Sequence, residues 1–386
     1  MGTQGIAILG ATGSIGKSAL AVLDQHPEHF RTVALTANRS ADALEELVSH
    51  YRPRLAVLVE DGARNGRPAR GGTRWSSGRE GLIEAATHPE ADIVLNALVG
   101  AAGLESTLAA LRAGKRVALA NKESLVCGGP LVLEAAREGG GELIPVDSEH
   151  SAILQCLQGS RGAEIRRLVL TASGGPFRSL PPEDLARVRP RDALRHPTWE
   201  MGAKITIDSA TLANKALEVI EAHFLFGISY DRIEAVVHPQ SIIHSMVEFV
   251  DGSVLAQMGF PTMEIPILYA LSHPRRLPYE CRRFDPLAAG QLTFEAVREE
   301  SFPAFSLGVA AGRAGGTAPA VFNAANEVAV AAFLAEQISF PGIAGTIEHT
   351  LGRWSGGEPS SLRAVLESDA WARRTAETFI RSHLLC

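Results

Sequence analysis

The residues in this sequence best suited to chemistry are two carboxylates, Asp147 and Glu149, in the stretch PVDSEH at 145–150. An apolar run ending at Val146 precedes them and predicts a β-strand. Side chains two apart lie on one side of an extended chain, so we expect both carboxylates to reach one cation. The spacing alone fits a solvated surface pair better than a metal site. Support for a metal must therefore come from the rest of the chain.

Composition limits the classes of protein to consider. A chain of 386 residues with 46% apolar and 21% charged residues is typical of a globular protein with two or three domains. The net charge of -6 argues against general binding to nucleic acid or to anionic membranes. No apolar run approaches the roughly 18 residues that span a bilayer, and the N-terminus lacks a signal-peptide pattern. We therefore expect a cytoplasmic protein. The four cysteines form no Cys-x-x-Cys pair, which fits reduced thiols and argues against zinc.

A glycine-rich stretch, GATGSIG at 10–16, lies between an apolar run at 5–9 and a helical pattern at 17–25. In such a turn the glycines permit positive φ and close approach of a pyrophosphate, which the free N–H groups of the helix start then bind. The spacing Gly-x-x-Gly-x-x-Gly meets the dinucleotide fingerprint only in part, so a plain β-to-α turn is the competing interpretation.

The end of the next expected strand, at 32–37, indicates which nucleotide is bound. An acidic residue there accepts from the ribose of NAD, whereas Arg39 with Asn38 and Ser40 offers donors suited to the 2′-phosphate of NADP. We therefore favour NADP, with an exposed loop arginine as the alternative.

Strands and helices alternate up to residue 150 and predict a doubly wound parallel sheet. Strands are expected at 55–59, 92–95, 116–119 and 142–146, with helices at 104–112 and 124–138. Asn121, Lys122 and Glu123 follow one of these strands, at the edge where such sheets bind ligands, so the asparagine and the lysine are expected to face cofactor or substrate. The stretch at 61–79, rich in Gly and Arg, is expected to be an exposed connection, and we assign it no function.

Beyond residue 150 the pattern is that of an α+β domain. A strand at 165–171 leads to Ser173, whose hydroxyl and neighbouring amides suit an oxyanion. The stretch RHPTWEMG at 195–202, bracketed by Pro and Gly, is typical of a loop that moves over a site. A helix expected from 209 to about 226 places Asn214 and Glu218 on one face beside Lys215, which suits a phosphate next to a metal. A surface ion pair is the simpler interpretation.

The remaining chain is expected to be structural. Strands at 233–237, 245–250 and 253–258 include a hairpin, and helical runs at 319–334 and 362–385 belong to an alanine-rich segment. Apart from Asn323, Asn326 and Glu327, this segment lacks clustered catalytic residue types, and we interpret it as a helical packing domain.

Taken together, these blocks resemble the 1-deoxy-D-xylulose 5-phosphate reductoisomerase family. The resemblance rests on GATGSIG at 10–16, ANKESL at 120–125, PVDSEH at 145–150, SGGPFR at 173–178, RHPTW at 195–199, DSATLANK at 208–215, HPQS at 238–241, DGSVLAQ at 251–257 and NAANE at 323–327. It spans nearly the whole chain in order. It implies a homodimer that uses NADPH and Mg²⁺ or Mn²⁺. The implied reaction rearranges and reduces 1-deoxy-D-xylulose 5-phosphate to 2-C-methyl-D-erythritol 4-phosphate in the non-mevalonate isoprenoid pathway.

The resemblance also implies residue roles. The metal ligands are Asp147, Glu149 and Glu218, a set of carboxylates that suits a hard cation. The phosphate site comprises Ser173, Ser209, Asn214 and Lys215, with Ser148, Lys122 and His196 near the carbon skeleton and Trp199 on the closing loop. Lys122 and His196 join the three metal ligands as catalytic residues, and Glu149 and Glu218 also contact substrate. The NADPH site comprises Thr12, Gly13, Ser14, Ile15, Asn38, Arg39, Ser40, Asn121, Glu123, Gly202 and Met263.

The expected organisation has an N-terminal Rossmann-like NADPH-binding domain (1–147), an α+β catalytic and dimerisation domain (148–285), a linker (286–301) and a C-terminal helical domain (302–386). A mobile loop is expected near 195–205. Two alternatives stay open: a metal-free NADP dehydrogenase acting on a sugar or semialdehyde, whose activity would survive EDTA, and a nucleotide-sensing binding protein. The polar residues beyond the cofactor turn argue against a sensor.

Overall fold

The computed structural model describes residues 2–60, 72–160, 162–199 and 201–384. Contacts divide the chain into two compact units, and both are discontinuous in sequence. The first unit comprises Met1–Ser124, Leu131–Ser151 and Thr262–Cys281. The second comprises Leu125–Pro130, Ala152–Pro261 and Arg282–Cys386. The four functional ranges expected from the sequence stay a prediction.

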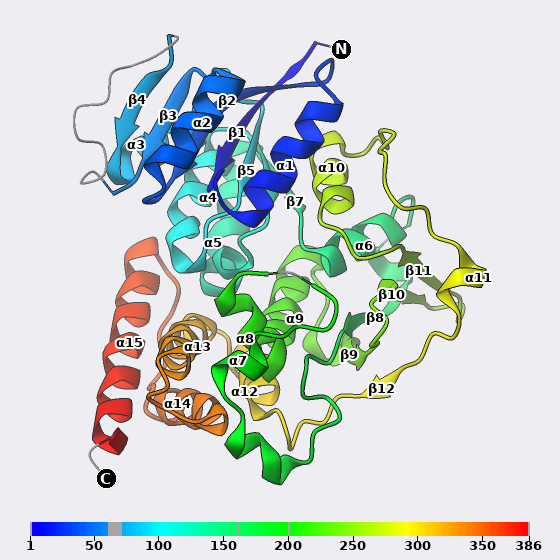
Figure 1. Cartoon of the computed structure of the whole chain (residues 1–386), viewed down its shortest axis with the longest axis vertical. Helices are drawn as coiled ribbons and strands as arrows, with labels where there is room; N and C mark the ends of the chain where they lie inside the picture. Colours follow the sequence, from blue (N-terminus) through cyan, green and yellow to red (C-terminus); the bar gives the residue numbers. More distant parts are fainter. Residues whose placement is uncertain (1, 61–71, 161, 200, 385–386) are drawn as a thin grey trace. The chain divides into compact units, whose positions relative to one another are not determined.

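The first unit is built on a seven-stranded parallel sheet with the strand order β4-β3-β2-β1-β5-β6-β7 (Figure 1). The strands are β1 (Gln4–Leu9), β2 (Phe30–Ala37), β3 (Leu55–Leu58), β4 (Arg74–Ser77), β5 (Ile93–Asn96), β6 (Arg116–Leu119) and β7 (Glu142–Pro145). The order reverses between β1 and β5, which is the crevice where open α/β sheets bind ligands. The predicted doubly wound Rossmann-like sheet is confirmed.

Helices connect these strands because each strand must cross over to a parallel neighbour. They are α1 (Ser14–Gln25), α2 (Ala41–Tyr51), α3 (Gly78–Ala86), α4 (Gly103–Arg112) and α5 (Lys122–Gly139). From much later in the chain, α10 (Glu264–Ser272) packs beside α1, where Ser18 donates a hydrogen bond to Glu264 (2.9 Å). The sequence pattern had not associated α10 with this unit.

The expectation for 61–79 needs correction where it can be compared. Residues 61–71 lie outside the described residues, but the rest of the stretch forms β4 and the start of α3 rather than an exposed connection. The sequence RWSS carries one apolar side chain, because β4 is an edge strand with neither face fully buried. Without an apolar run, the pattern had nothing to predict a strand from.

The second unit has a five-stranded mixed sheet with the order β11-β10-β8-β9-β12. Its strands are β8 (Ile165–Ala172), β9 (Ile233–Val237), β10 (Ile243–Phe249), β11 (Val254–Met258) and β12 (Glu295–Ala296). The β8–β9 pair is parallel and the other pairs are antiparallel, including the predicted β10–β11 hairpin. The α+β character of this part of the chain is therefore confirmed.

Helices form the rest of the second unit. They are α6 (Ser148–Cys156, which starts in the first unit), α7 (Pro190–Ala193), α8 (Ala203–Thr211), α9 (Ala213–Phe226), α11 (Pro286–Ala289), α12 (Pro303–Ala314), α13 (Ala318–Leu334), α14 (Phe340–Gly352) and α15 (Leu362–Leu384). One apolar core joins α8 and α9 to α12, α13 and α14, with Phe322 and Phe333 fully buried in it. The C-terminal helical segment thus shares its core with the helices that carry the expected phosphate site.

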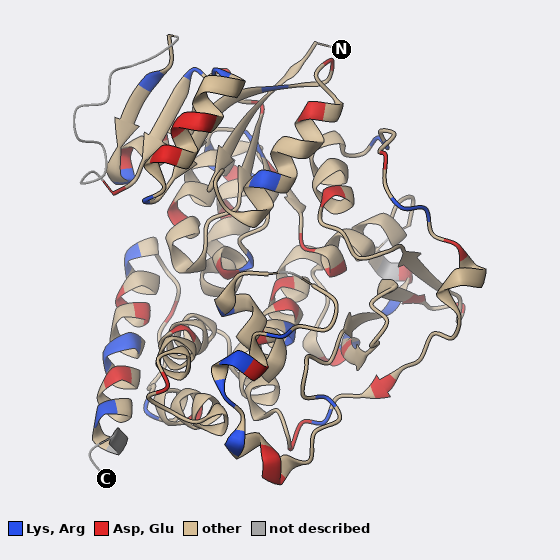
Figure 2. Cartoon of the chain, viewed as in Figure 1, with Lys and Arg blue, Asp and Glu red and all other residues tan. Residues whose placement is uncertain are grey.

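The last helix, α15, is amphipathic. Acidic and basic bands alternate along it (Figure 2), while Val365, Ala372, Ala376 and Ile380 recur at helical spacing and are buried against the rest of the unit. This pattern confirms the helical prediction for 362–385 over the described residues. Among helices of the described ranges, none has the length and apolar content that crossing a membrane requires.

The single helix expected from 209 to 226 is wrong. It is two helices, α8 and α9, that meet at Leu212, where the backbone takes a left-handed φ of 59°. Ser209 therefore lies in the last turn of α8, and Asn214 lies in the first turn of α9. The break was not foreseen because leucine has no preference for this conformation.

Candidate active site

The turn after β1 has the conformation that a dinucleotide phosphate needs. Gly10 has a φ of 87°, and a Cβ atom there would lie 2.7 Å from the Ala97 carbonyl oxygen. A Cβ on Gly16 would lie 2.5 Å from the Gly10 carbonyl oxygen, so only glycine allows α1 to approach β1 this closely. Gly13 caps α1 without a side-chain hydrogen bond, and both Gly13 and Ser14 are exposed. This turn fits a bound phosphate group.

The predicted 2′-phosphate donors share an acid that the sequence analysis missed. Arg39 donates from Nε to Glu60 Oε2 (2.6 Å), and Asn38 donates from Nδ2 to Glu60 Oε1 (3.1 Å). All three side chains are exposed, as is Ser40. The hydrogen bond with Glu60 raises the pKa of Arg39, while the pKa of Glu60 is lowered by the same bond. Glu60 follows β3, so nothing in the spacing around Arg39 indicated it.

The acid pair is arranged by a helix start, which corrects the extended geometry expected from the sequence. Because α6 begins at Ser148, Glu149 lies in its first turn, and the Glu149 N–H donates to Asp147 Oδ1 (3.2 Å). Aspartate is favoured immediately before a helix for this reason. One carboxylate oxygen from each of Asp147 and Glu149 lies within 4.8 Å of the other. Ser148 donates to Glu149 Oε2 (2.5 Å). The two carboxylates therefore still converge as expected, but through the start of a helix and not through an extended chain.

Lys122 supplies the positive charge beside this pair. Its ammonium forms an ion pair with Asp147, and the two side chains are only 6% and 11% exposed. His150, fully buried, places Nδ1 3.5 Å from Asp147 Oδ1. Burial alone would raise the pKa of Asp147, but Lys122 and His150 together hold it well below its usual range. Asp147 is therefore a carboxylate at neutral pH, and the oxygen donors of Asp147 and Glu149 fit a hard divalent cation.

The neighbouring Asn121 is a structural brace. Fully buried, it donates from Nδ2 to the carbonyl oxygens of Leu98 and Gly100 (2.9 Å each), which fixes the loop after β5. The same Nδ2 atom lies 3.2 Å from Oε2 of Glu123, a residue that is 9% exposed. Met263 precedes α10 and is half-buried. The loop that Asn121 holds lies at the same carboxyl edge of the sheet as the glycine turn.

In the second unit, two predicted phosphate residues meet one histidine. His196 Nε2 lies 3.0 Å from Ser173 Oγ and 3.1 Å from Ser209 Oγ. Its Nδ1 accepts from the backbone N–H groups of Thr198 and Trp199. Because Nδ1 acts as an acceptor, the neutral ring carries its proton on Nε2. Burial lowers the pKa of His196, which favours this neutral form.

The start of α9 gathers an amide, an ammonium and a carboxylate. Asn214 donates to Glu218 Oε1, and the ammonium of Lys215 pairs with Glu218 Oε2. Lys215 and Glu218 are 2% and 1% exposed. The predicted common face of Asn214 and Glu218 is confirmed, and Lys215 reaches the same carboxylate. Around the connection to α8, Trp199 is half-buried and Gly202 is the exposed residue that precedes the helix.

The fold and the site together are typical of a nucleotide-dependent oxidoreductase with its own substrate domain. Three features indicate this class: a parallel sheet with a glycine turn that fits a phosphate, a lysine–aspartate pair at the same edge, and a second unit rich in buried polar groups.

Comparisons with known proteins give the family. The model of 1-deoxy-D-xylulose 5-phosphate reductoisomerase matches residues 6–129, that of its C-terminal domain matches 143–226, and that of the DXP reductoisomerase C-terminal domain matches 258–375. The 1-deoxy-D-xylulose 5-phosphate reductoisomerase of Synechococcus sp. is 52% identical over 96% of each chain. That of Ralstonia nicotianae is 51% identical over 98% of this chain and 99% of the relative. This chain belongs to the 1-deoxy-D-xylulose 5-phosphate reductoisomerase family.

Two solved structures of this family are similar to the chain over nearly its whole length. The enzyme from Zymomonas mobilis in complex with NADPH is 44% identical with a TM-score of 0.91, over 98% of this chain and 100% of its own. A DOX-P reductoisomerase in complex with NADPH, fosmidomycin and magnesium is 42% identical with a TM-score of 0.93, over 98% of both chains.

Proposed function

We propose that this protein converts 1-deoxy-D-xylulose 5-phosphate into 2-C-methyl-D-erythritol 4-phosphate with NADPH, the rearrangement and reduction of the non-mevalonate isoprenoid pathway. The observation that carries the proposal lies within the first unit. The glycine turn after β1 and the Lys122–Asp147–Glu149 cluster after β6 and β7 stand at the carboxyl edge of one parallel sheet. A hydride donor and a charged site for substrate oxygens are thereby brought to one edge.

The cofactors we propose are NADPH and a divalent cation, Mg²⁺ or Mn²⁺. Asp147, Glu149 and Glu218 would hold the cation, which supplies Lewis-acid polarisation to neighbouring ketone and hydroxyl oxygens. The low pKa of Asp147 supports this assignment, since a ligand must be ionised at the working pH. Glu218 is buried and forms an ion pair with Lys215.

For NADPH, the glycine turn would receive the pyrophosphate, and the exposed donors after β2 would receive the 2′-phosphate. The residues proposed to line this site are Thr12, Gly13, Ser14, Ile15, Asn38, Arg39, Ser40, Asn121, Glu123, Gly202 and Met263. Glu60 already accepts from Arg39 Nε and Asn38 Nδ2. Because a guanidinium has five N–H donors, Arg39 can donate to a 2′-phosphate while it keeps its bond to Glu60.

The substrate phosphate would be held by Ser173, Ser209, Asn214 and Lys215. The two hydroxyls already converge on His196, and the amide and ammonium lie together on α9, so hydrogen-bond donors are in place before substrate arrives. Holding a part of the substrate that does not react supplies binding energy for orienting the part that does.

Lys122, Ser148 and His196 would contact the carbon skeleton. As a neutral ring with a proton on Nε2, His196 can donate to a substrate oxygen, and the Lys122 ammonium can stabilise developing negative charge. Trp199, on the connection between α7 and α8, would cover the site and exclude water from the reactive aldehyde. The same residues would thus serve both rearrangement and reduction.

We further propose a homodimer joined at one edge of the second unit's sheet. The sheet ends in β11 on one side and the short β12 on the other, and along β11 the side chains of Val254, Leu255 and Met258 are 51%, 49% and 38% exposed. An exposed apolar edge strand is normally covered, and a second copy of this chain is the occupant we infer. Light scattering should show a dimer that Leu255→Arg dissociates, while Leu287→Arg, at another exposed leucine, does not. The cytoplasm is the compartment we propose, since Cys127, Cys156 and Cys281 are free thiols.

The proposed activity is tested by mixing the protein with NADPH, Mg²⁺ and 1-deoxy-D-xylulose 5-phosphate and following absorbance at the nicotinamide band. We expect oxidation of NADPH that requires the sugar phosphate, stops with EDTA and returns with excess Mg²⁺. Oxidation that survives EDTA would favour the metal-free dehydrogenase. Tight NADPH binding without any turnover would favour a sensor.

A further inference from the structure

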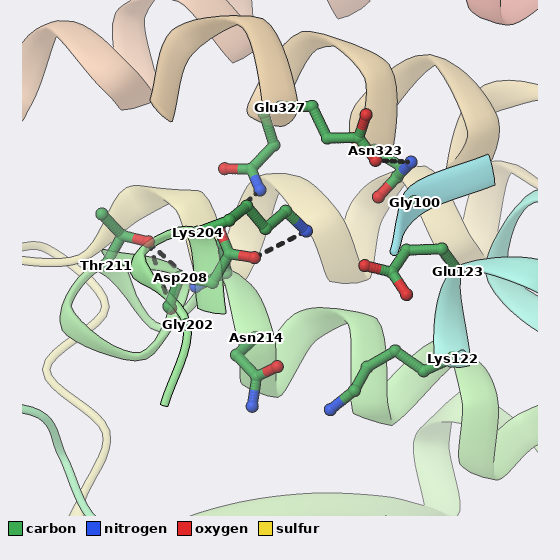
Figure 3. Close-up of polar contacts among 12 residues, drawn as sticks. Gly100, Lys122, Glu123, Gly202, Lys204, Asp208, Thr211, Asn214, Asn323 and Glu327 are labelled. Carbon is green, nitrogen blue, oxygen red and sulfur yellow. Dashed lines mark hydrogen bonds and ion pairs between the residues drawn. The ribbon is translucent and has the colours of Figure 1, made fainter. Parts of the chain in front are cut away.

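Asp208, a carboxylate that no role has yet been given, is buried in the second unit with both oxygens satisfied. It is 1% exposed on α8. Lys204, one turn earlier on the same helix, places Nζ 2.7 Å from Oδ2, a contact visible in Figure 3. Asn326, on α13, donates from Nδ2 to Oδ1 (2.8 Å). A buried carboxylate is tolerated only with such partners, so these contacts fix α8 to α13 in addition to the apolar core that the two helices share.

The position of α8 matters because both of its ends carry parts of the proposed substrate site. Its first residue follows the 194–202 connection that contains His196 and Trp199, and Lys204 lies in the first turn. Ser209 comes directly after Asp208 and lies 3.1 Å from His196. The two ends of α8 are thereby linked through one buried carboxylate.

Asn326 is itself an unusual residue to find in this core. It is fully buried in α13, and its Oδ1 atom has no hydrogen-bond partner among the described residues. A buried amide with an unsatisfied oxygen is unfavourable for folding compared with an apolar residue. Among the described residues, its side chain donates one hydrogen bond, to Asp208. We infer that this bond is the reason why an asparagine occupies the position.

A second buried amide on α13 provides the comparison. Asn323, three residues earlier, is also fully buried, and its Oδ1 has no partner among the described residues, but it donates to Glu327 (3.0 Å) rather than toward α8 (Figure 3). Glu327 in turn pairs with Arg373 of α15 (2.5 Å). Asn326 thus donates across to α8, whereas Asn323 donates along its own helix.

We propose that Asp208 and Asn326 are positioning residues for the substrate phosphate. They hold α8 so that Ser209 meets His196 and the preceding connection begins at a fixed point. The C-terminal helical segment, interpreted from its sequence as packing alone, then sets phosphate affinity through Asn326. This inference rests on the proposed function, because it takes the Ser209 region as the phosphate site.

The test compares Asn326→Leu with the matched control Asn323→Leu. For Asn326→Leu we expect the KM for 1-deoxy-D-xylulose 5-phosphate to rise about tenfold, the loss expected when a hydrogen bond to a charged group is removed, with the KM for NADPH unchanged within about twofold. The control should leave both values within about twofold of wild type. An equal rise for both variants, or a rise in the NADPH value alone, would overturn the inference.

Trypsin gives a readout that needs no substrate. Arg195 lies in the connection between α7 and α8, and Lys204 lies in the first turn of α8. Asn326→Leu should be cut at these two residues several-fold faster than wild type or Asn323→Leu, with cleavage sites assigned by mass spectrometry. Equal rates in all three proteins would refute the positioning role. If the wild-type protein does not turn over 1-deoxy-D-xylulose 5-phosphate, the proposed function is wrong. The trypsin rates would still show whether Asn326 holds α8 in place.

Two further variants guard against a simple folding defect. Lys204→Met removes the partly exposed partner of Asp208, and it should reproduce faster cleavage after Arg195 even if Asn326→Leu does not fold. Combining Asp208→Asn with Asn326→Asp exchanges the carboxylate and the amide and keeps one hydrogen bond between them. The KM of this exchange variant for 1-deoxy-D-xylulose 5-phosphate should lie closer to wild type than that of Asn326→Leu. Its change in log KM should be at most half of the change seen for Asn326→Leu. A value no better than that of Asn326→Leu would contradict the inference.

Discussion

Removing the ammonium beside Asp147, in the variant Lys122→Met, should destabilise the first unit in a manner that depends on pH. The methionine keeps the length of the side chain and deletes only its charge and hydrogen bonds. Lys122 and Asp147 are almost wholly buried, so the carboxylate would be left without its main counter-charge in a poorly solvated place. The variant therefore tests whether this pair keeps Asp147 ionised.

The size of the effect follows from the burial of the pair. Removing one partner of a buried ion pair costs about 3–5 kcal/mol, and the lower end applies here because Asp147 retains 11% exposure. For a unit of this size, each kcal/mol shifts the melting temperature by roughly 2–4 °C. We therefore expect the transition of the first unit to fall by about 6–12 °C at neutral pH.

The dependence on pH has a definite sign. Asp147 has a pKa lowered in the fold, so it contributes stability above its ordinary value of 3.8 that is lost as the pH falls through the lower folded value. Without Lys122, burial opposes the ionisation of Asp147, and only His150 offsets it. The variant therefore loses little stability when the pH is lowered and Asp147 is protonated. The difference in melting temperature should be largest at neutral pH and should narrow as the pH approaches 3.8.

Circular dichroism melts of wild type, Lys122→Met and the control Lys17→Met, recorded from about pH 7.5 to about pH 4.5, would measure this difference. Lys17 is an exposed lysine on α1, and its replacement should shift the melt by no more than about 2 °C. A shift for Lys122→Met no larger than the control, or a difference that stays constant with pH, would refute the reasoning.

Three further outcomes are expected. Arg39→Asp should raise the KM for NADPH at least about tenfold more than the KM for NADH, whereas Glu60→Gln should not weaken NADPH binding. If the ratio of the two KM values does not change in Arg39→Asp, Arg39 does not bind the 2′-phosphate. Glu218→Gln should keep NADPH affinity near normal in a fluorescence titration while lowering turnover about a hundredfold or more at saturating Mg²⁺, and normal turnover would remove Glu218 from the metal site. Because burial lowers the pKa of His196 from 6.5, the unfolded chain binds its proton first, and the free energy of unfolding should fall as the pH drops below 6.5. His196→Asn should show a smaller fall in urea titrations, and identical slopes would argue against a neutral buried ring.

Much of the first unit could be predicted from the sequence because local patterns determine it. The strands that end at Leu9, Asn96 and Leu119 contain short apolar runs buried on both faces, and the turn at Gly10 requires a glycine. By contrast, the edge strand β4 has no such run, and the break at Leu212 has no glycine or proline to mark it. These elements depend on tertiary contacts that a local pattern does not contain.

The site follows the same division. The proximity of acids and donors close in sequence, such as Asp147 with Glu149 and Asn214 with Glu218, was predicted from spacing, although the first pair converges through a helix start rather than a strand. Their assignment to a site came from the family resemblance. Partners distant in sequence were missed. Glu60 is more than twenty residues from Arg39, and pairing across such distances leaves no signal in a single sequence.

We propose that one site both rearranges the carbon skeleton and reduces it. This is tested by nuclear magnetic resonance of the product formed from ¹³C-labelled 1-deoxy-D-xylulose 5-phosphate, with NADPH consumption measured in parallel. We expect a branched product, 2-C-methyl-D-erythritol 4-phosphate, formed in equal amount to the NADPH oxidised. An unbranched reduced sugar phosphate, or a branched product formed without NADPH oxidation, would contradict it.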